Sequence, residues 1–310
     1  GAGGQQDAAG EWDEAEEEDD DDSEEREAMA AAAAAADAAV APGDVPSNAR
    51  LAAVQAANPE CADCGAPRPD WASLSLGVTL CIACSGVHRS LGVSVSKVRS
   101  MVLDSWDEAG VLALEAVGNE PANAAWQARL PDGWQPLRPS AQRADRQRFI
   151  EAKYKWRGFT VPAPEDELAA LVAPEAAARI VAAASASKAE GPTGGAAHEG
   201  ETSSGRAARR AAAMEALAGQ ALVLLAARGD SPGVSRCLAW GAAPGSVGLP
   251  ETAEASGGAV RPGDSAVGAA ARAGHASCVA QLLLCNAAVG EAERAAAEQG
   301  GDAAVAALLA

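Results

Sequence analysis

Apolar residues recur with helical spacing in the last third of the chain, from residue 214 to residue 310. Gly229, Val234 and Leu238 each have the same residue type 45 positions later, and residues 300–309 keep the valine and leucine spacing 26 positions after that. In each copy the pattern predicts a helix of small residues, a glycine turn, and a second helix with apolar residues at i, i+3 and i+4.

Helix pairs that repeat in this way resemble ankyrin repeats, whose usual period is about 33 residues. The longer first offset comes from the turn-rich stretch 244–264, and Ser265-Ala-Val-Gly stands where T-P-L-H is usual. We therefore expect an ankyrin-like array over residues 214–310, with an unrelated alanine-rich bundle as the alternative. The three cysteines of this region occupy apolar or near-apolar positions and are predicted to be core thiols. They are Cys237, Cys278 and Cys285.

Hydrophobic residues make up 48% of the 310 residues, but alanine dominates them and buries little area per residue. Eight of the ten aromatic residues lie between Trp71 and Phe159, which places a globular domain at residues 50–162. Residues 163–213 are expected to be a linker, because 185–206 is rich in glycine and serine and has no apolar period.

Charge is concentrated at the start of the chain. Residues 1–49 hold 16 acidic residues and one basic residue, a net charge of −15 out of −19 for the whole chain. Such a segment should be a disordered, solvated tail, with an interaction arm for a basic partner as the alternative. The chain as a whole lacks the basic character of a nucleic-acid binder. The sequence contains no run of about 18 uncharged apolar residues, so it predicts no membrane span. The chain begins with Gly1, so we expect it to be part of a longer protein.

Four cysteines have the spacing of a metal site. Cys61 and Cys64 are followed after sixteen residues by Cys81 and Cys84, a C-x2-C-x16-C-x2-C arrangement. Two such knuckles can close a tetrahedral shell of four thiolates around one structural Zn²⁺ ion. The odd total of seven cysteines argues against a disulfide framework and for a reducing compartment.

The residues around these cysteines are similar to the ArfGAP family, zinc-finger domains that activate GTP hydrolysis by Arf-type small GTPases. The resemblance covers about residues 55–160. It is carried by PRPDWASLSLG at 67–77, CSGVHRSLG at 84–92, VRSMVLDSW at 98–106, GNEPAN at 118–123 and FIEAKY at 149–154. With the repeats that follow, the chain is similar to ArfGAP proteins with ankyrin repeats, which commonly carry a PH domain upstream. The resemblance implies a mainly α fold with a small β element.

The resemblance also implies roles for individual residues. Arg89 would be the arginine finger, a cation placed against the charge that develops during phosphoryl transfer. Trp71 would support it, with a simple core aromatic as the alternative. His88 is expected to pack or form hydrogen bonds, since four thiolates already fill the metal shell. Arg99 is expected to face the partner.

Asp104 and Asn119 are expected to hold turns or helix caps. The family often has L-G-x-H-x-S after the finger, whereas Ser94 stands at the histidine position here.

The leading hypothesis is a GTPase-activating protein that acts in trans on a GTP-bound Arf-family protein and is not an enzyme on its own. The alternative is a catalytically weak scaffold or adaptor, which the Ser94 departure leaves open. Zinc-finger DNA binding is disfavoured, because residues 85–110 have three basic against three acidic residues. We expect a cytoplasmic protein in vesicle trafficking, with an unknown partner for the repeats. An upstream region would recruit it peripherally to Golgi, endosomal or plasma membrane.

Overall fold

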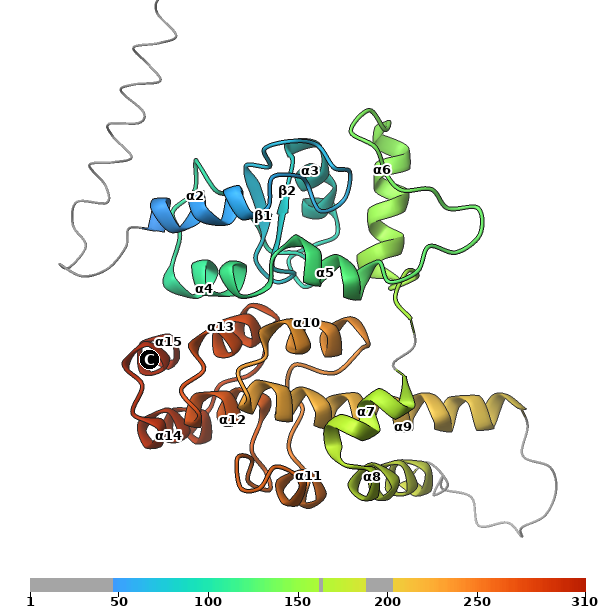
Figure 1. Cartoon of the computed structure of the whole chain (residues 1–310), viewed down its shortest axis with the longest axis vertical. Coiled ribbons are helices and arrows are strands. Elements are labelled where there is room, and N and C mark those ends of the chain that lie inside the picture. The colour runs from blue at the N-terminus through green and yellow to red at the C-terminus, as the bar shows by residue number, and fades with distance from the viewer. Residues whose placement is uncertain (1–46, 162–163, 188–202) are drawn as a thin grey trace, which may run out of the picture. The chain divides into compact units, whose positions relative to one another are not determined.

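The computed structural model describes residues 47–161, 164–187 and 203–310, in which helices predominate (Figure 1). The predicted acidic segment 1–49 therefore lies almost entirely outside the described residues. Residues 47–310 form one compact unit.

The first part of this unit surrounds a small sheet. The elements are α2 (Ser47–Ala57), β1 (Trp71–Ser73), β2 (Val78–Leu80), α3 (Ile82–Ser90), β3 (Val98–Ser100), α4 (Glu108–Val117), α5 (Asn119–Trp126), α6 (Arg143–Ile150) and the π-helical turn η2 (Glu151–Lys155). The strand order is β2-β1-β3, all antiparallel, with Trp71 opposite both Leu80 and Ser100. The expectation of a mainly α fold with a small β element is confirmed.

A tight turn joins β1 to β2. Gly77 lies in it with a φ of +66°, and a β carbon there would lie 2.6 Å from the Val117 side chain. Only glycine combines this backbone conformation with such a close approach. The turn is therefore held against the end of α4.

The aromatic residues do not form a single cluster. Phe149 and Phe159 are buried with their ring centroids 4.9 Å apart, and Trp134 packs edge-on against both. Tyr154 is also buried, beside Trp126, whereas Trp156 is 60% exposed. The compact domain predicted from the aromatic residues thus also depends on the aliphatic side chains of the sheet, such as the buried residues of β2.

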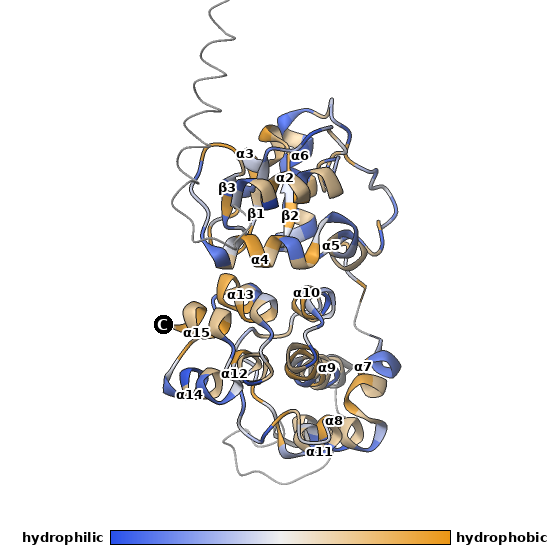
Figure 2. Ribbon diagram, turned by 60° about the vertical axis from the view of Figure 1, so that its left-hand side comes forward, coloured by the Kyte–Doolittle hydropathy of each residue, from blue (hydrophilic) through white to orange (hydrophobic). Residues whose placement is uncertain are grey.

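The last part of the chain contains the predicted helix pairs. They are α9 (Ser203–Ala227) with α10 (Ser231–Ala239), α12 (Ala266–Arg272) with α13 (Ala276–Leu284), and α14 (Glu291–Gly300) with α15 (Ala303–Leu309). Gly229, Gly274 and Gly301 turn the chain within the three pairs at positive φ. Figure 2 shows mostly hydrophobic colouring on α13 and α15, and more hydrophilic colouring on α14.

The expected core thiols have the predicted environment at two of three positions. Cys237 and Cys278 are fully buried, and burial raises the pKa of the first thiol to about 12 and of the second to about 11. Cys285 is half-buried, and its Sγ lies 3.3 Å from the carbonyl oxygen of Ser75. The turn-rich stretch 244–264 also contains a short helix, α11 (Pro250–Ala255).

The structure differs from the prediction of a linker at residues 163–213. Helices α7 (Glu165–Val172) and α8 (Pro174–Ser187) form within it, and both pack against α9. Leu168, Val172 and Ile180 are at most 2% exposed. Their apolar side chains are sparse among alanines and acids, but burial against α9 is sufficient to order the two helices. Residues 188–202 of the predicted linker lie outside the described part.

Helix α9 contains a stretch, Ala207–Ala227, that is long and apolar enough to cross a membrane by length and composition. Its most apolar window is 67% buried within the fold, and Leu217, Leu222 and Leu224 belong to the hydrophobic core. Packing against neighbouring helices accounts for its apolar character.

The two parts of the unit touch through helices. Helix α13 packs on α4, and α10 packs on α4 and α5. Ala239 of α10 is buried in the same hydrophobic cluster as Trp126. Residues 50–162 therefore share core contacts with the repeat helices in this structure.

The close approach of α14 to α12 generates a prediction. A β carbon on Gly300 would lie 2.6 Å from the carbonyl oxygen of Ala271 and 2.7 Å from that of Arg272. Because backbone cannot yield as a flexible side chain does, Gly300→Ala should destabilise the fold by about 1–3 kcal/mol in urea unfolding. Gly245→Ala is the matched control, since no atom lies within 4 Å of its β carbon. Equal stability of the two variants would contradict this packing.

Candidate metal centre and arginine surface

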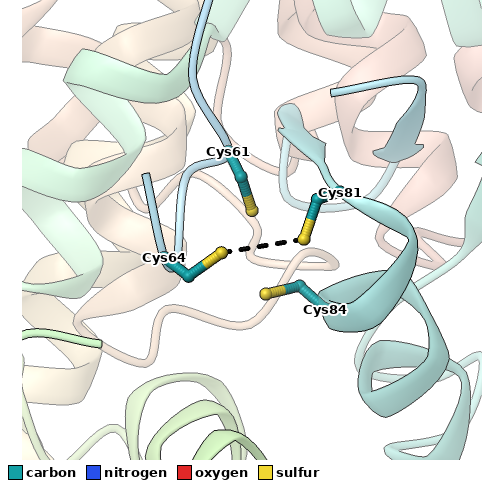
Figure 3. Close-up of side chains that lie close together, drawn as sticks. All are labelled: Cys61, Cys64, Cys81 and Cys84. Carbon is teal, nitrogen blue, oxygen red and sulfur yellow. Dashed lines mark hydrogen bonds between the residues drawn. The ribbon is translucent and has the colours of Figure 1, made fainter. Parts of the chain in front are cut away.

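Four cysteine sulfurs meet beside the sheet. Cys61 and Cys64 come from the loop between α2 and β1, Cys81 precedes α3, and Cys84 lies in the first turn of α3. The side chains converge on one point (Figure 3), and all four sulfurs lie within 4.8 Å of one another. The prediction that the two knuckles come together is confirmed.

The geometry of the cluster fits a tetrahedral ion. Four sulfurs at about 2.3 Å from a zinc ion lie about 3.8 Å from one another. The Sγ atoms of Cys64 and Cys81 are 3.6 Å apart, close to that separation and far beyond a disulfide bond of about 2 Å. Hydrogen bonding with Cys61 lowers the pKa of Cys64, while the pKa of Cys61 itself is raised. Without a cation, the four groups cannot all ionise at this distance.

A buried cation stands behind the cluster. The Arg146 side chain lies in the core, with the residue 4% exposed, and its Nη1 atom donates to the Sγ of Cys84 over 3.0 Å. Its Nη2 atom donates to the carbonyl oxygens of Pro139 and Ala141. The guanidinium thus offsets negative charge on a sulfur ligand and fixes the loop before α6 against the metal site.

An ionic network lies on the other side of the first knuckle. Asp63, between the two cysteines of that knuckle, accepts hydrogen bonds from Lys153 over 3.0 Å, Tyr154 over 3.0 Å and His88 over 2.9 Å. Burial alone would raise the pKa of Asp63, but the charge of Lys153 and the hydrogen bond from His88 hold it below the usual value. The side chains of Asp63, His88 and Lys153 are all completely buried. The π-helical turn η2 supplies Lys153 and Tyr154 as consecutive buried residues.

The predicted finger lies on the outer side of the same helix. Arg89 is exposed near the C-terminal end of α3, and its guanidinium carbon lies 4.5 Å from the ring centroid of Trp71. This is a cation–π contact, which orients the side chain without neutralising it. Among the residues that the structure describes, none forms a hydrogen bond or ion pair with the Arg89 side chain.

Asp104 and Arg99 hold local turns, whereas Asn119 joins segments 40 and 59 residues away and is not the N-cap of α5, which is Gly118. Asp104 accepts a hydrogen bond from the backbone N–H of Ser100, as expected for a turn residue. Asn119 accepts from the backbone N–H of Thr79 and donates to the carbonyl oxygen of Glu60, so it joins α5 to β2 and the first knuckle. The side chain of Arg99 donates to the carbonyl oxygen of Ser105, which ties it to its own turn.

The departure at Ser94 falls on the surface. Ser94 is exposed and lines a cavity of about 380 Å³ together with Val95 and Trp126. The serine of the same motif, Ser96, is buried and lies 2.9 Å from the Nδ1 of His88. The substitution therefore leaves the hydrogen bonds of His88 intact.

Sequence reasoning missed Asp63, Lys153 and Arg146. All three are charged residue types that usually lie on the surface, and each has a partner 62 to 91 residues away in the chain. One signal was local: Asp63 lies inside a C-x2-C knuckle, where a fold around four sulfurs would bury it.

Comparison with known proteins agrees with this site. Residues 48–163 match the ArfGap family, described as a putative GTPase activating protein for Arf. An ADP-ribosylation factor GTPase-activating protein of Arabidopsis thaliana, AGD12, is 44% identical over 122 residues, which is 39% of this chain and 36% of that protein. The Arf-GAP with coiled-coil, ANK repeat and PH domain-containing protein 2 of Gallus gallus is 45% identical over 118 residues, 38% of this chain and 15% of that protein.

A solution structure of the ArfGap domain of human RIP aligns with a TM-score of 0.35 at 21% identity and covers 41% of this chain and 92% of that chain. The four-cysteine cluster beside the small sheet fits a zinc-finger domain. Residues 48–163 are an ArfGap domain. The chain covers about a third or less of the length of the two curated relatives.

The contact between Arg146 and Cys84 predicts a large effect of removing the guanidinium. Arg146→Met removes the hydrogen bond to the buried sulfur of Cys84 and the donor to the carbonyl groups of Pro139 and Ala141. We expect a loss of about 3–5 kcal/mol in the free energy of unfolding, measured with urea on metal-loaded protein. Arg143→Met, at an exposed position on the same helix, is the control and should change stability little. A similar result for both variants would refute the assigned role of Arg146.

Proposed function

We propose that this chain is a GTPase-activating protein for a GTP-bound Arf-family GTPase, and that Arg89 enters the active site of the partner as an arginine finger. The single observation that carries the proposal is an exposed arginine with no anionic partner among the described residues, held over Trp71 on a helix anchored by Cys84. In folded proteins an arginine guanidinium is usually paired with an anion or fully solvated. The Arg89 guanidinium is instead oriented by the Trp71 ring, and its N–H groups are available to a partner.

The chemistry required of such a residue is simple. Hydrolysis of GTP spreads negative charge over the oxygens of the transferred phosphoryl group. A guanidinium brought from another protein can donate to two of these oxygens through a rigid planar fork, whereas the three donors of an ammonium have no such fixed geometry. An arginine supplied in trans accelerates hydrolysis by about 10³–10⁵-fold.

Exposed apolar side chains support a protein partner at the same place. The most exposed large apolar residues in the described part of the chain are Ile82, Val93, Val102 and Leu103, with exposed fractions of 69–75%. Ile82 lies two helical turns before Arg89 on α3. Val102 and Leu103 follow β3, whose residue Ser100 pairs with Trp71. Such side chains remain exposed at a cost unless a partner covers them.

We also propose that the four cysteines hold one structural Zn²⁺ ion. The separation of the sulfurs fits zinc, and a closed shell of four thiolates is typical of a structural zinc site. A catalytic zinc site keeps one coordination position open for water or substrate. When bound, the ion supplies folding free energy. It would fix the start of α3 and so the base of the finger.

The helix pairs after residue 203 are proposed to be an ankyrin-like array that binds another protein. The pairing of helices around turn glycines supports this, as does the Ser265 side chain, which accepts from the backbone N–H of Gly268 at the start of α12. The name of the Gallus gallus relative includes ANK repeats. We propose a cytoplasmic site of action in vesicle trafficking, with peripheral recruitment to a membrane.

The finger is tested by single-turnover hydrolysis on a GTP-loaded Arf-family protein. Arg89→Ala should lower the stimulated rate by about 10³-fold or more, and Arg89→Lys should not restore it, because a point charge lacks the planar fork. Arg143→Ala, also an exposed arginine of the domain, is the control. Equal stimulation by wild type and Arg89→Ala would refute the arginine finger, and no stimulation by either would favour the scaffold alternative.

The metal proposal is tested by elemental analysis and chelation. We expect about one zinc ion per chain and loss of the folded signal in circular dichroism after treatment with a strong chelator. Cys84→Ser should lower the zinc content, and Cys285→Ser, a half-buried cysteine outside the cluster, should not. Zinc-free protein that remains folded would refute a structural ion.

A further inference from the structure

The residue before the proposed finger points the opposite way. Arg89 is exposed, whereas His88 is completely buried, and both ring nitrogens of His88 have partners. Nε2 lies 2.9 Å from the Oδ2 of Asp63, and Nδ1 lies 2.9 Å from the Oγ of Ser96. The backbone at the base of the finger is therefore attached on two sides.

One of these attachments leads back to the tip of the finger. The Oγ of Ser96 lies 2.7 Å from the Oγ of Ser73, which is in strand β1. The same strand begins with Trp71, the ring over which the Arg89 guanidinium lies. The path from Arg89 through His88, Ser96, Ser73 and Trp71 thus returns to Arg89 as a closed circuit.

Every link of this circuit can be made by the groups present. Each ring nitrogen of an imidazole can take part in a hydrogen bond, and each serine hydroxyl can donate one hydrogen bond while it accepts another. The circuit is also tied to the Asp63 side chain, which Lys153 contacts as well. Such a chain is strong in a buried setting and fails if one member is removed.

Ser96 is the member without another evident task. It lies in the irregular loop between α3 and β3, yet it is only 1% exposed. We propose that Ser96 is a positioning residue for the arginine finger: by joining His88 to Ser73 it fixes helix α3 against strand β1 and so sets where the Arg89 guanidinium lies over Trp71. This inference rests on the proposed function of Arg89. A displacement of about 1 Å at a reacting group costs as much as 100-fold in rate.

The test uses the whole chain with its metal bound and a GTP-loaded Arf-family protein. Ser96→Ala should lower the maximal single-turnover rate about 10- to 100-fold. The concentration of this protein that gives half of the maximal rate and its zinc content should stay the same. Ser73→Ala should produce the same loss, and the double variant should add nothing, because the two hydroxyls act as one link. Ser96→Cys, close in volume but a weak donor, provides a milder variant if alanine prevents folding.

Ser231→Ala is the matched control. Ser231 is 3% exposed and its hydroxyl donates to that of Ser277 in the repeat helices, so the substitution removes a part-buried hydrogen bond between two serines far along the chain from the finger. We expect a small loss of thermal stability and an unchanged hydrolysis rate. A rate loss equal to that of Ser96→Ala would mean that the rate reports general stability, which would overturn the positioning role.

The decisive comparison is made without the finger. In an Arg89→Ala background, Ser96→Ala should cost nothing further, since no guanidinium remains to be positioned. In the NMR spectrum, the ring-current shift that Trp71 imposes on the Arg89 side-chain protons should shrink in Ser96→Ala. If Ser96→Ala hydrolyses as fast as wild type, or slows the Arg89→Ala background equally, the inference is wrong. If Arg89→Ala itself has no effect, the proposed function fails instead.

Discussion

The convergence of four cysteine sulfurs is the constraint on which the rest of the ArfGap domain depends. Cys61 and Cys64 come from a loop, whereas Cys84 lies in helix α3, so a single point joins segments that share little apolar surface. Four thiolates within 4.8 Å of one another repel unless a cation lies between them. Once they are held, the start of α3 has no freedom to shift, and that helix also carries Arg89.

Buried charge then extends this constraint through the domain. Asp63 lies in the first knuckle and contacts Lys153 of η2 and His88 of α3, with no exposure of any of the three side chains. Burial of ions is costly, and apolar residues of similar volume often stabilise a fold as well. These charged groups add specificity, because their hydrogen bonds form only when the partners lie at the right distance and orientation. In a domain with small cores and a three-stranded sheet, that specificity orients helices that packing alone would leave loosely defined.

The sequence could predict features whose residues lie close together along the chain, but not contacts between residues far apart in it. The knuckles and the pairing of helices around Gly229 are visible as local spacings, and Arg89 and Trp71 through a motif. The contact of Arg146 with Cys84 and that of Lys153 with Asp63 cross 62 and 90 residues, so no local pattern carries them. Helices α7 and α8 were missed for another reason: their few apolar residues are ordered by burial against α9, a tertiary effect that overrides a weak local pattern.

Two arginines of this domain show how environment separates structure from function. Arg146 is buried and forms hydrogen bonds with one sulfur and two carbonyl groups of its own domain, so its guanidinium is not accessible to a partner. Arg89 lies on the other face of the helix that carries the same sulfur, and its only described contact is the ring of Trp71. An aromatic face attracts a guanidinium but accepts none of its N–H bonds in the plane of the group. Arg89 is therefore held in place with its donors unspent, which is the condition that a residue acting on another protein's phosphate must meet.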